Sequence, residues 1–137
     1  MVVARFMIEL TGRPKEVVSQ GLGKLSATFE ERYKVRHKEL SEPELIKGTT
    51  LYSAFIEIEF ETKNFSEFFS AMLDFGPTVV EILSPKEINI KRDELQDVST
   101  DLMNKIHELS KFIQDLSIEN MTLKQQKQLS PKSNKKR

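Results

Sequence analysis

The sequence predicts an α+β fold, namely a ferredoxin-like βαββαβ sandwich followed by a long C-terminal coiled-coil helix. Two observations lead to this prediction. The first 91 residues contain segments with an apolar residue at every second position, typical of strands, and segments with apolar residues three or four positions apart, typical of helices. Residues 95–123 then carry a leucine at every seventh position, which is typical of a coiled coil.

The first half of the expected sandwich runs from a strand through a helix to a second strand. Residues 4–10 alternate between apolar and polar positions, and Pro14 then lies where the first turn of a helix tolerates a missing N–H. Gly21 and Gly23 lie inside the helix and each costs up to about 1 kcal/mol relative to alanine, so we expect close packing on the sheet to explain one of them. A second strand over residues 33–38 carries its basic residues on one face. The apolar stripe of the helix consists of Val18, Leu22, Leu25 and Phe29.

The second half of the sandwich repeats this order. Residues 53–60 alternate clearly and predict a third strand. The next helix has a good N-cap residue in Asn64, and it ends at Gly76, which a proline follows. Residues 78–83 predict a fourth strand, and residues 86–90 predict a short fifth one.

Two right-handed βαβ halves of this kind close into an antiparallel four-stranded sheet with both helices on one face. We expect residues 41–48, which contain a proline and a glycine, to form a loop. Each predicted strand has one apolar side and one mixed side, so we expect only one face of the sheet to be covered. The bare face is then a natural place for a partner, a ligand or a second subunit.

Composition and charge divide the chain into three parts: an α+β domain over residues 1–91, a coiled-coil helix over 92–125 and a basic disordered tail over 126–137. The net charge is zero, but six basic and no acidic residues follow Leu123, which leaves 15 basic and 21 acidic residues before them. The absence of cysteine excludes disulfides and thiolate chemistry. With no secretion signal and no long apolar run, we expect a cytoplasmic protein that does not enter a membrane.

The heptad pattern predicts that the long helix associates with a second copy of the chain. When the leucines occupy position d, position a contains two isoleucines and Asn120, a combination that favours parallel two-stranded coiled coils. A lone asparagine at position a fixes register and strand number, because its amide pairs best with its symmetry mate. The expected association residues are Leu95, Leu102, Ile106, Leu109, Ile113, Leu116, Asn120 and Leu123.

The same helix has a second interpretation, in which it packs along its own domain. Val98 and Phe112 fall at position g and Met103 at position e, so the apolar stripe is wider than a strict two-stranded seam. The sequence therefore favours self-association and leaves intrachain packing open.

The residues that usually carry out catalysis or bind metals form no recognisable site. His37 and His107 have no ligand at metal spacing on a shared face, and no phosphate-binding glycine loop or nucleophile motif occurs. The carboxylates Glu57, Glu59 and Glu61 alternate on one strand face, as solvated side chains commonly do. We therefore expect no enzyme activity, no metal and no cofactor.

Nucleic acid is an alternative partner for the open sheet face. The stretch from Ala54 to Ile56 resembles part of the RNA-recognition-motif signature, in which aromatic side chains lie on an open sheet. Only Phe55 keeps a stacking aromatic there, and the acidic Glu57 and Glu59 share its face. The candidate nucleic-acid face consists of Arg5, Lys34, Arg36, Lys38 and Phe55, with the basic tail as a second weak contact.

The stretch FFSAMLDFGPTVVEILSPKE, residues 68–87, resembles the C-terminal extension domain of WYL-type transcriptional regulators. Those domains end with a helix, a glycine turn, a short valine-rich strand, a proline and another helix. The resemblance covers about 90 residues with the preceding elements, but the helix-turn-helix and WYL portions are missing, so it does not imply a DNA regulator. The matching positions are Gly76, Val79, Val80, Ile82, Leu83 and Pro85.

The chain is also similar to the ACT domain, whose first loop carries a proline and a glycine before the first helix. Here Gly12 and Pro14 occur in the opposite order. Both resemblances imply a regulatory, dimer-forming module. We therefore expect a non-catalytic homodimeric scaffold or regulatory protein that also binds another protein. A sensor with a small-molecule site near Gly12 and Arg13, or a nucleic-acid-binding module, is the alternative.

Overall fold

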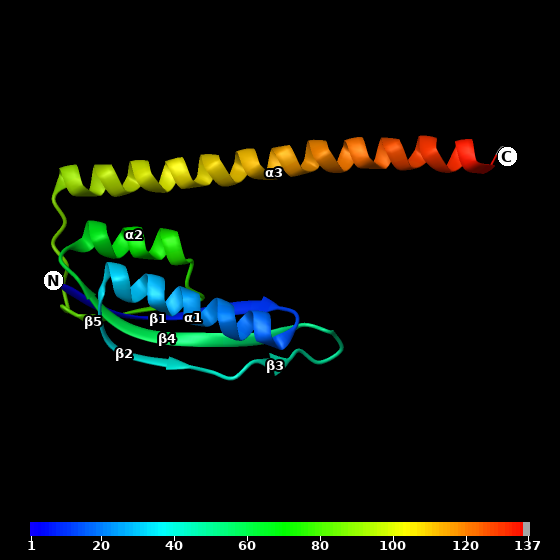
Figure 1. Cartoon of the computed structure of the whole chain (residues 1–137). Coiled ribbons are helices and arrows are strands. Elements are labelled where there is room, and N and C mark those ends of the chain that lie inside the picture. Colours follow the sequence, from blue (N-terminus) through cyan, green and yellow to red (C-terminus); the bar gives the residue numbers. More distant parts are fainter. Residues whose placement is uncertain (136–137) are drawn as a thin grey trace. The chain divides into compact units, whose positions relative to one another are not determined.

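The computed structural model describes the backbone of residues 1–135 and the side chains of residues 1–127. In this range the chain forms an antiparallel sheet and three helices, which confirms the α+β class (Figure 1). The last helix continues to Lys135, past the boundary expected at residue 125, and the side chains of the expected tail over residues 126–137 lie almost entirely outside the described part. The elements are β1 (Val2–Gly12), α1 (Lys15–Arg32), β2 (Lys34–Leu40), β3 (Glu44–Leu45), β4 (Tyr52–Thr62), α2 (Phe65–Phe75), β5 (Val79–Ser84) and α3 (Arg92–Lys135).

The sheet has the strand order β2-β4-β1-β5, and every neighbouring pair is antiparallel. The two long central strands, β1 and β4, pair without interruption from Val2 opposite Thr62 to Gly12 opposite Tyr52. Because residues opposite each other share a face, this register aligns the apolar side of one strand with the apolar side of the other.

Two sequence-based predictions about strands are wrong. The expected loop over residues 41–48 contains the two-residue strand β3, which pairs with the start of β4 and gives the sheet a fifth strand. The expected strand over residues 86–90 is absent, because Ile88 packs against the hydrophobic core and the segment pairs with no strand of the described chain. From sequence alone, a short apolar run that pairs in a sheet cannot be told from one that only packs against the core.

The core lies between one face of the sheet and both α1 and α2. Phe6 of β1 contacts Phe29 of α1 and Phe68 of α2, with ring centroids 6.2 and 5.8 Å apart. Phe60 of β4 contacts both Phe6 and Phe29 at 4.7 Å. Such aromatic pairs contribute about 0.5–1.5 kcal/mol each beyond the burial of their area. One central ring thus contacts both helices, which places α1 and α2 on the same face of the sheet (Figure 1).

The start of α3 belongs to the same compact unit as the sheet. That unit extends from Met1 to Val98, seven residues past the predicted domain boundary, and the remainder of the chain forms a second unit. One Glu94 carboxylate oxygen accepts hydrogen bonds from the backbone N–H and the hydroxyl of Ser66, in the first turn of α2, at 3.0 and 3.1 Å. Val98 is only 4% exposed. The first two turns of α3 are therefore part of the folded body.

Candidate association surface and the open face of the sheet

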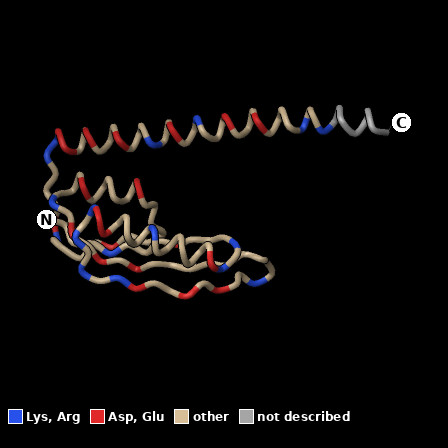
Figure 2. The backbone as a smooth tube through the Cα atoms, in the orientation of Figure 1, with Lys and Arg blue, Asp and Glu red and all other residues tan. Residues whose placement is uncertain are grey.

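The predicted association residues form an exposed apolar row along α3. The five leucines and two isoleucines of this row are each between 37% and 61% exposed. Burial of a leucine or isoleucine side chain typically contributes about 1.5–3 kcal/mol. Covering this row with another apolar surface would therefore stabilise the resulting complex substantially. None of the a and d positions from Leu95 to Leu123 carries a charged residue. Along the whole helix, acidic residues predominate early in α3 and basic residues follow near its described end (Figure 2).

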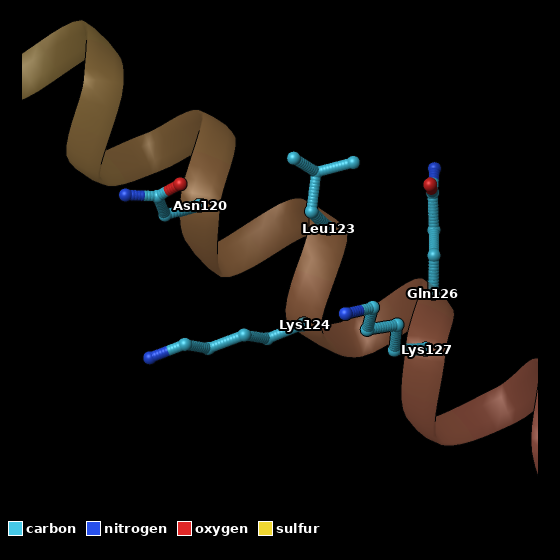
Figure 3. A pocket seen from close by; sticks show the side chains of 5 residues that line it. All are labelled: Asn120, Leu123, Lys124, Gln126 and Lys127. Carbon is cyan, nitrogen blue, oxygen red and sulfur yellow. The ribbon is translucent and has the colours of Figure 1, made fainter. Parts of the chain in front are cut away.

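The C-terminal part of this row contains polar residues. A shallow hollow on the helix surface is lined by Asn120, Leu123, Lys124, Gln126 and Lys127, and all five occupy positions a, d, e or g of the heptad (Figure 3). Asn120 and Lys127 are successive a positions on either side of Leu123, a d position. The hollow is thus a stretch of the predicted seam without an opposing helix, and no site for a small molecule follows from it.

Apolar residues outside the seam have different environments. Val98, which widens the stripe at position g, is buried within the sheet-containing unit and is not available to a second helix. Met103 and Phe112 are exposed, at 48% and 60%. Ile118 and Met121 lie at positions f and b on the outer side of the helix, and each is 63% exposed. Intrachain packing therefore accounts for Val98 and leaves the a and d residues beyond it exposed.

The open face of the sheet is a network of ion pairs. Arg5, on β1, lies among Glu57 and Glu59 of β4 and Glu81 of β5, with closest nitrogen–oxygen distances of 3.3, 3.4 and 2.8 Å. Arg36 and Lys34, on β2, both pair with Glu61 of β4, at 2.8 and 3.7 Å. Three of the predicted phosphate-binding cations are therefore already paired with carboxylates of the same face.

The expected single basic face on β2 is wrong. A bulge between Val35 and His37 changes the alternation, so that Lys38 lies opposite the buried Ile58 on the helix-covered side, where its ammonium contacts Glu30 and Ser26 of α1. Alternation from sequence assumes a regular strand, and a bulge reverses it. Phe55 remains exposed on the open face, at 42%. Lys38 therefore lies on the opposite side of the sheet from the other residues of the candidate nucleic-acid face.

Ion pairing on this face lowers the pKa of one of its acids. The pKa of Glu61 is lowered, first because its carboxylate accepts a hydrogen bond from Arg36 and further because of the positive charge of Lys34. On the other side of the body, burial raises the pKa of Tyr33, whose hydroxyl accepts a hydrogen bond from Arg32. Both shifts have complete structural explanations in neighbouring side chains.

The candidate small-molecule loop after β1 has a structural role in the described chain. Arg13 donates a hydrogen bond to the Thr50 hydroxyl at 2.6 Å, which links this turn to the loop before β4. Gly12 precedes the turn, and a methyl group added to it would lie 3.6 Å from Val18.

The described residues show neither a metal-binding cluster nor a membrane-spanning helix. Among the described residues, no group of three or more histidine, aspartate or glutamate side chains is arranged to hold a metal ion. His37 lies 3.3 Å from Glu39 on exposed β2, and His107 lies on the outer side of α3. The described helices include none that is both long and apolar enough to span a bilayer.

Comparison with known proteins gives one family-level result. The model of the MJ0538 family matches residues 3–134, which is nearly the whole chain. No curated protein matches, and no solved structure matches. The match includes both the sheet and most of α3, so the two compact units occur together in the family pattern.

Proposed function

This chain belongs to the MJ0538 family, and we propose that it is a non-catalytic scaffold or regulatory protein that self-associates through α3 as a parallel two-stranded coiled coil. The sheet-containing body is the recognition domain, and association makes its binding bivalent. Two linked sites bind a repeated or symmetric partner more tightly than one site, because the second contact becomes intramolecular.

The exposed apolar row of α3 is the observation that carries this proposal. A row of seven leucines and isoleucines at a and d positions extends over four heptads, and each side chain is at least 37% exposed. A helix with an uncovered apolar stripe lacks the packing that supplies most of the stability of helices in proteins. A second copy supplies an identical stripe with the same spacing.

The polar residues of the seam support a parallel orientation. In a parallel pair, Asn120 faces Asn120 of the second copy, and the two amides can bond to each other. In the antiparallel register that aligns Ile113 with Leu109, Asn120 faces Leu102 of the second copy. Each buried amide would then lack a partner, at about 1–3 kcal/mol. Ion pairs do not favour either orientation, because Glu119 faces Lys124 of the second copy in the parallel pair and Lys105 in the antiparallel one.

The body resembles a ferredoxin-like domain in the arrangement of its strands. The order β5-β1-β4-β2 with antiparallel neighbours, and two helices on one face, supports this assignment, with β3 as an addition. The open face is largely occupied by its own ion pairs, so it favours a protein partner over a polyanion.

Sedimentation equilibrium of the full chain tests the proposal. We expect twice the mass of one chain, and we expect the double variant Leu109→Glu with Leu116→Glu to sediment as a monomer. Two glutamates at d positions would place charges inside the seam, where an unpaired charge is costly.

The matched control is Ile118→Glu with Met121→Glu. These side chains are at least as exposed as the two leucines, but they lie on the outer side of the helix. The control should keep the mass of the unmodified chain. A monomeric unmodified chain, or equal effects of both double variants, would contradict association through this seam.

A further inference from the structure

The edge strand β5 has an unusual surface for the end of a sheet. All six of its residues are exposed, and four of them are apolar: Val79, Val80, Ile82 and Leu83, at 38–52%. Only β1 pairs with β5 in the described chain, so the other side of the strand presents backbone N–H and C=O groups without strand partners. Such an edge is a template for another strand.

The opposite edge of the same sheet is protected. On β2 the bulge between Val35 and His37 interrupts the ladder, and five of the seven residues of the strand have titratable side chains. Natural proteins use bulges and charges of this kind to prevent pairing at sheet edges. In β5 the residues from Val79 to Ile82 pair with Met7 to Ala4 in unbroken register, and the irregularity lies only beyond them. The two edges of the sheet therefore differ in their readiness to accept a strand.

Charge on the open face indicates what kind of strand fits. Across the sheet, Glu81 of β5 lies opposite Arg5 of β1, which lies opposite Glu59 of β4. Arg5 is shared by three carboxylates, and the Glu81 side chain is 54% exposed at the end of this row. A basic residue in the next position of the row would continue the alternation of charge, and opposite charges across strands are stabilising.

On the helix-covered face, β5 presents apolar side chains. Val80 and Ile82 lie opposite the buried Phe6 and Ala4, on the side of the sheet that the helices cover. Successive residues of a strand point to opposite faces, so one incoming strand can place apolar residues beside Val80 and Ile82 and a basic residue beside Glu81.

We propose that β5 is a docking site for an extended segment of a partner protein in which apolar and basic residues alternate. The segment adds to the sheet as a further strand beyond β5. Its backbone hydrogen bonds provide affinity, and the alternation of side chains provides specificity. This inference is independent of the coiled coil, because it concerns only the sheet-containing unit.

Two synthetic peptides test the proposal with the full-length chain: one of alternating valine and lysine, and one of alternating valine and glutamate, both with blocked ends. We expect the lysine peptide to shift the backbone amide resonances of residues 79–84 and to bind at least tenfold more tightly than the glutamate peptide. Glu81→Lys should reverse this preference. Absence of binding by the lysine peptide, equal binding of both peptides, or shifts confined to other residues would overturn the proposal.

A double variant and a control on the other edge locate the contact. Val80→Lys with Ile82→Lys should weaken binding of the lysine peptide at least tenfold, whereas Leu40→Lys, at an equally exposed position of β2, should leave it unchanged. Unchanged resonances of the strand that does not touch the substitution, β4 for the double variant and β1 for Leu40→Lys, show that each variant is folded. If the double variant instead lowers the mass of the chain without peptide, a second copy occupies the edge and the proposed partner segment is wrong.

Discussion

At the scale of single residues, the open face of the sheet is set by pairs that the sequence does not reveal. The alternation of Glu57, Glu59 and Glu61 is visible in the sequence, but their cationic partners lie far away along the chain, on β1 and β2. Antiparallel pairing brings these charges opposite one another. The sequence therefore indicates where the acids point, and the register decides what neutralises them.

Titration of Glu61 tests this pairing. Its folded-state pKa lies below the ordinary value of 4.5, because Arg36 donates a hydrogen bond to the carboxylate. The resulting stability is present above the unfolded pKa and is lost as pH falls through the folded pKa. We expect Arg36→Gln to raise the Glu61 pKa toward 4.5, as measured from its carboxyl carbon resonance, while Arg5→Gln should change it less. An unchanged pKa in Arg36→Gln would refute this explanation.

At the scale of helices and strands, two glycines are needed for different reasons: Gly21 for close packing against the sheet and Gly76 for its backbone conformation. A methyl group added to Gly21 would lie 3.2 Å from Leu10, whereas one added to Gly23 would meet nothing within 4 Å. Close packing on the sheet thus explains Gly21, as predicted for one of the two. Gly76, which ends α2, has φ of 53° and donates its N–H to the Met72 carbonyl, so a left-handed residue is required there.

Alanine at these glycines should have opposite effects on the free energy of unfolding. Gly23→Ala should raise it by up to about 1 kcal/mol, because alanine is the better helix former at this exposed position. Gly76→Ala should lower it by about 1–2 kcal/mol, because a side chain is strained at positive φ. Urea denaturation measures both, with Gly21→Ala expected between them. A stabilising effect at Gly76 would contradict the assigned cap.

At the scale of the whole molecule, the proposed coiled coil gives Asn120 a role in fixing the number of copies that associate. Replacing it with leucine should raise the thermal stability of the assembly while allowing several oligomeric states, because the amide limits register and strand number. Melting curves and sedimentation together measure this.

The control for that substitution is Asn104→Leu, which makes the same change at position f, on the outer side of the helix. It should leave both the mass and the distribution of oligomers unchanged. A loss of thermal stability in Asn120→Leu would place this residue outside the seam.

The sequence by itself determined the α+β class, four of the strands, both short helices and the long apolar row of α3. These features depend on spacing within a few residues, which repeats with the period of each element. Only the tertiary structure decided which strands lie at the edges, that β2 bulges, that Lys38 lies on the helix-covered side of the sheet and that Val98 belongs to the body. Those outcomes depend on contacts between residues far apart in the chain, where packing and register override local periodicity.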